Sequence, residues 1–338
     1  MRAASVMSHP DGRLSTYRQI VKAPQISAAG FADGAKEVMM LNTASLLADA
    51  LGRNLAGTYR RIYGDQEPRI PAGLDETARL VIERIASSDA LYHDCEHTAL
   101  VTLCVQDILR GRRLERIVSP SDWAHTILAA LTHDIGYVRG VCAGDTADHF
   151  VIDAAGRTAT PPRGASDAYL MPYHVERSKI MVRERFASVP FIDEERIAAA
   201  IELTRFPVPD EEDRSATDTE PALVRAGDLI GQLGDPLYLR KLNALYCELV
   251  ENGVHKQLGY ESPADMVDRY PQFYWNKVER YVGDALRYLE MTIEGKRWTA
   301  TLYSHIFAIE HNRRRLGPQA APAQEKRRVA VARTTSST

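Results

Sequence analysis

The sequence predicts an all-α protein, and three observations carry that prediction. Apolar residues recur at the three- and four-residue spacing of an amphipathic helix along most of the chain. Helix start signals precede several of these stretches, as at Ser119 to Asp122, where a proline stands at the first helical position. One internal stretch, residues 141–172, breaks the helical rhythm, and its apolar run followed by turn residues suggests a short hairpin or irregular insertion.

The composition is that of a globular chain. The protein has 338 residues, of which 45% are hydrophobic and 26% charged, with a formal net charge of −3. This balance gives no basic footprint for nucleic acid, and no run approaches the roughly 20 apolar residues of a membrane span. Because the N-terminus lacks a signal-peptide core, we expect a cytoplasmic protein. The four cysteines lack C-x-x-C spacing, which argues against a disulfide framework and a thiolate zinc site.

One helical domain with two appendages accounts for the whole chain. Residues 1–35 mix Pro, Gly, Ser and Ala without a sustained period, so we expect an extended or disordered arm. Residues 316–338 end in T-T-S-S-T and are expected to form a disordered tail. Residues 36–315 are predicted to be a single domain, which opens with one or two packing helices up to about Tyr63.

Two histidines lie near the start of a strongly patterned helix. We expect this helix to begin at about Asp89, a good N-cap, and to end where Gly111 follows Arg110. His93 and His97 would then share one face with an apolar stripe. A lone histidine there is usually a hydrogen-bonded core residue, but the pair and a later His-Asp favour a ligand role for His97. For His93, a proton-transfer role and a structural role both stay open.

An adjacent His and Asp end the next predicted helix. It starts at Ser119 and reaches His133 and Asp134 in its last turn before Gly136. Burying both side chains costs free energy unless something compensates them, and a metal ion would compensate both. The partial negative charge of the helix C-terminus also favours a cation. His125 lies roughly 12 Å upstream along the axis, so it is expected to be a surface or packing residue.

The segment after this pair is either a lid beside the site or a surface insertion, since long loops next to a site often control access. The chain then returns to helix at His174, and the basic residues that follow, Arg177 among them, most simply form a solvated face. A further helix begins at Asp193 and stops before Pro207.

A third acidic position, Asp228, sits between Gly227 and Gly231 on an otherwise apolar helix. The two glycines allow another helix to approach closely, which would bury the carboxylate. A buried carboxylate needs a metal ion or an arginine as its partner. Helical periodicity continues from Leu237 to about Asn312, with aromatic residues that we expect mostly in the core.

These motifs resemble, in order and spacing, the HD metal-dependent phosphohydrolase superfamily over roughly residues 85–290. The residues that carry the resemblance are His97, His133, Asp134 and Asp228. Within that superfamily, Y-H-D-C-E-H-T-A-L-V at residues 92–101 is most similar to the Y-H-N-x-x-H-A-x-D-V signature of the class I cyclic nucleotide phosphodiesterases. Three positions depart from the family pattern, with Asp94 in place of Asn, Leu100 in place of Asp and Tyr137 in place of a second His.

The resemblance implies an HD-domain helical bundle that binds one firm divalent metal through His97, His133, Asp134 and Asp228. Imidazole and carboxylate ligands without thiolate suit Mn, Fe, Zn, Co or Mg. A weaker second ion is implied at His174 and the second oxygen of Asp134, although the histidine cluster that usually completes such a site is absent. His93 would protonate the leaving oxygen as a general acid, with Asp134 and Asp228 also in the catalytic group. Arg177, Gln232 and Tyr137 are assigned to substrate binding.

The implied activity is hydrolysis of a phosphoester with metal-activated water, and a 3′,5′-cyclic nucleotide is the leading substrate. Three alternatives stay open: a nucleotide or (p)ppGpp phosphohydrolase, an HD-type di-iron oxygenase, and a non-catalytic HD scaffold that senses a ligand. The expected partner is a small phosphoester, with neither nucleic acid nor membrane, and a homodimer is left open.

Overall fold

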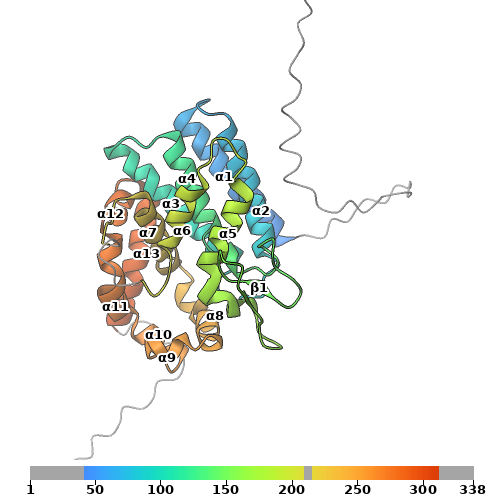
Figure 1. Ribbon diagram of the computed structural model, residues 1–338. Helices are drawn as coiled ribbons and strands as arrows, with labels where there is room; N and C mark the ends of the chain where they lie inside the picture. Colours follow the sequence, from blue (N-terminus) through green and yellow to red (C-terminus); the bar gives the residue numbers. More distant parts are fainter. Residues whose placement is uncertain (1–41, 209–214, 312–338) are drawn as a thin grey trace, which may run out of the picture.

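The computed structural model describes residues 42–208 and 215–311, and these are mostly helical (Figure 1). The all-α prediction is therefore confirmed. The expected arm at 1–35 and tail at 316–338 lie outside the described residues, as do both margins of the predicted domain. Within the described ranges, no helix combines the length and the apolar character needed to cross a bilayer.

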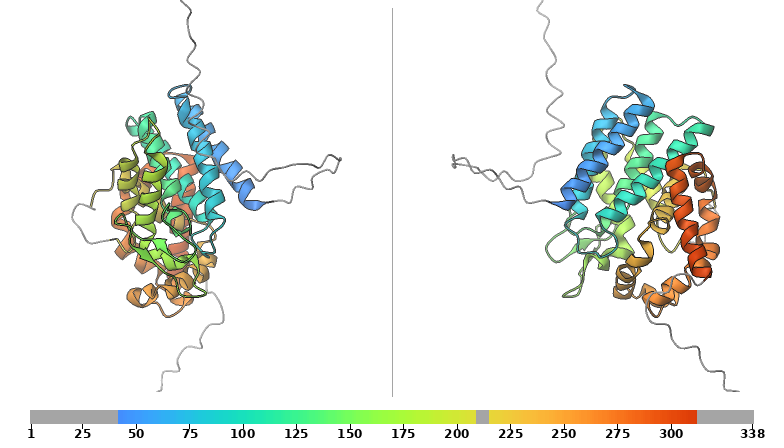
Figure 2. Two further views of the ribbon diagram at one scale, coloured as in Figure 1. Left: turned by 45° about the vertical axis from the view of Figure 1, so that its right-hand side comes forward. Right: turned by 180° about the vertical axis from the view of Figure 1, so that it is seen from behind.

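The first half of the chain builds four long helices. These are α1 (Thr43–Tyr63), α2 (Arg69–Ile85), α3 (Cys95–Glu115) and α4 (Pro120–Thr132). Helices α1 and α2 pack side by side along one edge of the molecule (Figure 2). The capping box predicted at the start of α4 is present, since the Ser119 and Asp122 side chains each bond the other's backbone N–H.

The predicted interruption of the helices is also present. After the short 3-10 helix η2 (Ile135–Tyr137), strands β1 (Phe150–Val151) and β2 (Thr158–Ala159) form an antiparallel hairpin with Phe150 opposite Ala159. The 3-10 helix η3 (Asp167–Tyr173) then leads directly into α5 (His174–Phe186).

The second half of the chain is built from shorter helices. These are α6 (Glu194–Glu202), α7 (Glu220–Leu233), α8 (Tyr238–Glu251), α9 (Val254–Leu258), α10 (Pro263–Asp268), α11 (Tyr270–Phe273), the π-helical η5 (Tyr274–Val278), α12 (Glu279–Leu289) and α13 (Ile293–Glu310). Helices α9 and α10 lie together at one end of the molecule (Figure 1).

Helix α3 differs from its predicted bounds at both ends. It begins at Cys95, because the Asp94 side chain accepts hydrogen bonds from the N–H groups of Glu96 and His97, both at 2.9 Å. It also continues through Gly111 instead of ending there. A Cβ on Gly111 would lie 1.9 Å from the Tyr288 carbonyl oxygen, so this glycine allows α12 to approach rather than ending the helix.

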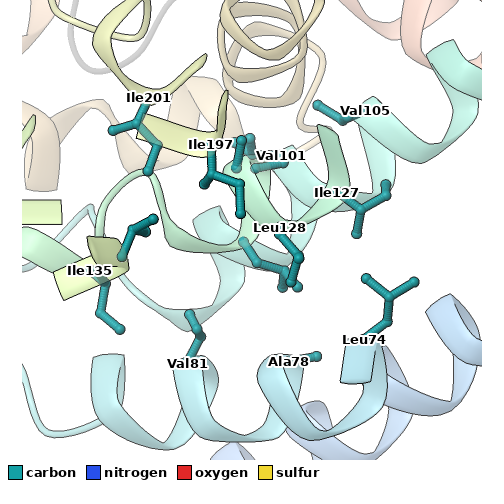
Figure 3. Packing of buried hydrophobic residues seen from close by; sticks show 14 of the residues in the cluster. Leu74, Ala78, Val81, Val101, Val105, Ile127, Leu128, Ile135, Ile197 and Ile201 are labelled. Carbon is teal, nitrogen blue, oxygen red and sulfur yellow. The ribbon is translucent and has the colours of Figure 1, made fainter. Parts of the chain in front are cut away.

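Two apolar clusters form the core, and α3 contributes to both. Val101 and Val105 face the cluster shared with α2, α4 and α6, part of which Figure 3 shows. Cys104 and Ile108 face the cluster formed with α7, α8, α12 and α13. Because both faces of α3 are packed, its N-terminus is held rigidly at the centre of the molecule.

The contact between α3 and α7 depends on small residues, as the sequence predicted. A Cβ on Gly231 would lie 2.8 Å from the Cα of Val101.

We therefore expect Gly231→Ala to lower the free energy of unfolding by about 1–3 kcal/mol, the usual cost of overpacking. Denaturant titration measures this. Gly283→Ala is the matched control, because a Cβ on that α12 glycine would have no atom within 4 Å and the change should be neutral or slightly stabilising. An equal decrease in the free energy of unfolding in Gly231→Ala and Gly283→Ala would show that close approach of α3 and α7 at Gly231 is not what makes the substitution costly.

An ion network joins α5 to α6. The Glu202 carboxylate accepts hydrogen bonds from Arg205 at 2.9 Å and Lys179 at 2.8 Å. Burial opposes its ionisation, but the two cations outweigh burial and lower the pKa of Glu202 from 4.5 to about 2. A folded pKa below the unfolded one stabilises the protein above the unfolded pKa, and that stabilisation is lost as pH falls toward 2.

We accordingly expect Glu202→Gln to be less stable than the parent protein at neutral pH, with the difference narrowing as the pH falls below about 4.5. Urea titrations at a series of pH values test this. Glu290→Gln, at an exposed glutamate, is the control. If the difference in free energy of unfolding between Glu202→Gln and the parent stays constant with pH, the ionised Glu202 carboxylate does not stabilise the fold.

Candidate metal centre

Four predicted ligands converge from three parts of the chain. His97 comes from the first turn of α3 and Asp228 from the middle of α7. His133 and Asp134 lie in the turn between α4 and η2, just past the helix whose last turn was predicted to hold them. The Nε2 atoms of His97 and His133 each lie 3.1 Å from Asp134 Oδ2. Each also lies 3.6 Å from Asp228 Oδ1. Metal–ligand bonds of about 2.1 Å at ligand–metal–ligand angles of roughly 90–120° place neighbouring ligand atoms roughly 3.0–3.6 Å apart, so these separations suit a shared ion.

The hydrogen bonding around the centre also fits a metal ion. Nδ1 of His133 bonds the Ala130 carbonyl at 2.8 Å, which directs Nε2 toward the other ligands. His133 Nε2 and Asp134 Oδ2 are both buried, and although they lie 3.1 Å apart, neither makes a hydrogen bond of acceptable geometry within the described residues. Buried polar atoms left in this state are costly and call for an explanation. These side chains could hold a divalent ion that would satisfy both atoms.

Opposite charges are stabilised at this position. Burial works against ionisation of both His133 and Asp134, but their mutual attraction outweighs it. The pKa of His133 is raised well above its usual range, and the pKa of Asp134 is held well below its own. Asp134 is therefore an anion, the form in which a carboxylate binds a cation, and a bound metal ion would take the place of the proton on His133, since only the neutral imidazole is a ligand.

His174 lies on the other side of Asp134. Its Nε2 is 3.6 Å from Asp134 Oδ1, and its Nδ1 bonds the Met171 carbonyl at 2.6 Å. Burial lowers the pKa of His174, which favours the neutral imidazole that metals bind. The two Asp134 oxygens thus face different histidines, which is the arrangement expected if this carboxylate joined two ions.

Glycine and serine set the position of His174. A Cβ on Gly136 would lie 2.0 Å from the His174 carbonyl oxygen, so only glycine permits this approach of α5. The Ser178 hydroxyl donates to the His133 carbonyl at 2.7 Å and accepts from the Gly136 N–H at 2.9 Å. These bonds tie the first turns of α5 to the His-Asp turn.

His93 is paired with a carboxylate that the sequence reasoning missed. His93 lies in the bend before α3, not on the helix as predicted, and its Nδ1 is 2.5 Å from Glu248 Oε2. The other oxygen of Glu248 accepts the Tyr92 N–H at 2.6 Å. Burial would lower the pKa of His93, but Glu248 outweighs it and raises that pKa to about 9. In the sequence, Glu248 stands among regularly spaced apolar residues of α8, where a charged side chain is unusual. The structure buries this side chain, which is only 1% exposed.

Tyr137 separates the two outer histidines. Its ring stacks on His93, with centroids 4.5 Å apart, and on His174, with centroids 4.7 Å apart. The position where the resembled family has a second histidine therefore holds an aromatic spacer. Tyr137 also faces the adjoining cavity.

A cavity of about 110 Å³, several times the volume one water requires, opens beside the centre. His93, Asp134, His174 and Asp228 form its polar end. Gln232 also lies on its wall, as its assignment to substrate binding requires. The insertion at 141–172 contributes Met171 to the wall, whereas the β-hairpin itself lies elsewhere.

The assignment of Arg177 to substrate binding is wrong, as is its placement on a solvated face. Arg177 is 0% exposed and is not on the cavity wall. Its guanidinium bonds the carbonyls of Gly136 at 2.6 Å and Val138 at 2.8 Å, and pairs with Asp145 at 2.9 Å. This arginine anchors the insertion, because carbonyls left by irregular backbone need buried donors.

His125, predicted to be a surface or packing residue, is a packing residue. Its side chain is buried, and its Nε2 accepts the Asp193 N–H at 2.8 Å at the start of α6.

Comparison with known proteins gives one match. No curated protein matches the chain, and neither does any solved structure. Residues 41–312 match a family model described as Npun_R2479-like, a description that names no activity. Since this match spans most of its length, the chain belongs to the Npun_R2479-like family.

Proposed function

We propose that this protein is a divalent-metal-dependent phosphoester hydrolase with an HD-type centre. The observation that carries the proposal is the convergence of His97, His133, Asp134 and Asp228, of which Asp134 and Asp228 also line the polar end of the cavity. A divalent ion bound there would supply activated water and neutralise charge on phosphoryl oxygens.

The remaining side chains have roles that follow from their contacts. Glu248 holds Nδ1 of His93, which leaves Nε2 as the nitrogen available to a bound substrate. His93 would carry a proton there and give it to the departing oxygen, which makes the leaving group more stable. Tyr137 keeps the His93 ring in place by stacking, so that the proton is held at one position.

The test is metal analysis of the purified protein, followed by turnover assays with and without dioxygen. Substrates should include 3′,5′-cyclic nucleotides, (p)ppGpp and simple phosphodiesters. We expect metal-dependent release of the ester alcohol that does not change when dioxygen is removed, since hydrolysis uses water. Oxygen-dependent turnover would instead favour the di-iron oxygenase. Metal binding without any turnover would favour a ligand-sensing scaffold.

A second ion would rest largely on His174, Asp134 and the substrate's own oxygens, and would bind more weakly than the first. We expect His174→Ala to reduce affinity for this second ion and to reduce turnover, while the first ion stays bound. Metal titration by calorimetry, together with metal content after dialysis, separates the two sites. Two tightly bound ions that both survive loss of His174 would contradict this proposal.

A further inference from the structure

The wall of the cavity changes character away from the metal centre. Beyond the polar end it is lined by apolar side chains from α7, α8, α9 and α10, including Leu229, Leu242, Leu245, Leu249, Leu258 and Met266. Several of them, such as Leu242 and Leu249, belong to the second apolar cluster. The cavity is therefore an opening in a hydrophobic core, with the predicted metal ligands at one end.

Several polar side chains on this wall make hydrogen bonds with the protein itself. Gln232 donates to the Tyr238 hydroxyl, Thr204 to the Ile201 carbonyl, Tyr270 to the Leu233 carbonyl, Arg225 to the Ala216 carbonyl and Arg205 to Glu202. The Arg225 guanidinium also lies over the Tyr281 ring, 4.2 Å from its centroid. Each of these side chains already uses at least one donor group on a protein partner, so fewer donors remain for a ligand.

This pattern discriminates between kinds of organic group. A sugar or base that entered the apolar part would give up hydrogen bonds to water without equivalent partners, which is unfavourable. An alkyl, prenyl or aryl group makes no hydrogen bonds to water that it would have to give up. Its affinity would rise by about fourfold for each methylene removed from water.

We infer that the substrate is a phosphoester carrying an apolar organic group, with its phosphate at the metal centre and the apolar group along the leucine-lined wall. This inference rests on the proposed function, and it favours such an ester over a nucleotide. In the reaction, a water oxygen bonds to phosphorus and one ester P–O bond breaks, with its electron pair remaining on the departing oxygen. That oxygen takes the proton from His93, and the proton lost by the water returns to His93 or to solvent.

The test uses a series of alkyl 4-nitrophenyl phosphodiesters with methyl, butyl and octyl chains, which differ only in apolar length. We expect kcat/KM to rise by about fourfold for each added methylene that the wall accepts. Leu245→Ala, which alters the wall, should reduce the octyl-to-methyl ratio by about tenfold or more, since it removes several buried carbon atoms. Leu239→Ala is the matched control, because Leu239 is on the same helix and in the same cluster but not on the wall.

A binding measurement separates this inference from the proposed function. Calorimetry with butyl and octyl phosphate in the presence of a chelator reports on the wall without any turnover. The inference is supported if octyl phosphate binds more tightly than butyl phosphate and if Leu245→Ala, but not Leu239→Ala, removes this difference. If that result is obtained but no ester is hydrolysed, only the proposed function fails. Hydrolysis and binding that are independent of chain length, or equal effects of the two leucine variants, overturn the inference while leaving the hydrolase intact.

Discussion

His133→Ala is expected to remove the bound divalent ion and the activity together. His133 Nε2 is buried and lies 3.1 Å from Asp134 Oδ2, so its loss removes one of the four ligands and leaves an incomplete ligand set of His97, Asp134 and Asp228. Metal affinity should fall by more than the about 10–100-fold that follows from replacing a group that only hydrogen-bonds a ligand. Metal content after dialysis and turnover of a phosphodiester are the measurements, and Asp228→Ala should give the same pair of results.

Thermal unfolding provides a further measurement. Adding metal should raise the Tm of the parent protein but not that of His133→Ala, because an ion stabilises only the fold that binds it. The matched control is His125→Ala. His125 is a buried histidine of the same helix, but its side chain packs against the start of α6 and does not face the metal centre. That variant should be destabilised yet still bind metal. Full metal occupancy in both His133→Ala and Asp228→Ala would overturn the metal assignment.

His93→Ala is expected to keep the metal and to lose about 10²- to 10⁴-fold in rate, the usual size of a general-acid contribution. His97→Ala should instead lose the metal, although the two rings lie only 5.3 Å apart. The measurement is kcat for a pair of esters with good and poor leaving groups. A nitrophenyl ester should lose less than an alkyl ester, because its leaving oxygen needs less protonation.

Glu248→Gln provides an intermediate case. It keeps a hydrogen-bonding group near His93 Nδ1 but removes the charge that raises the pKa of His93. We expect a smaller loss than in His93→Ala, with the same dependence on the leaving group and unchanged metal content. If kcat in His93→Ala and Glu248→Gln falls by the same factor for good and poor leaving groups, His93 is not the general acid and has a structural role.

Local signals in the sequence were sufficient for much of the helical framework. The capping box at Ser119 and Asp122 predicted the start of α4, and Asp193 predicted the start of α6. These succeeded because a cap and its helix lie within a few residues of each other. The start of α3 was placed too early, because Asp89 and Asp94 are both acceptable caps and only the bonds from Glu96 and His97 select Asp94.

The residues that could bind a metal were predicted from the resemblance to the HD superfamily, which the order and spacing of His97, His133, Asp134 and Asp228 carry. Their surroundings were not predictable in this way and depend on how the helices pack. Glu248 reaches His93 across 155 positions of sequence, and Arg177 turns inward to the carbonyls of Gly136 and Val151. The glutamate within an apolar stripe marks Glu248 as unusual but does not name its partner, because a hydrogen bond between distant segments is set by tertiary packing and not by the spacing of residues along one helix.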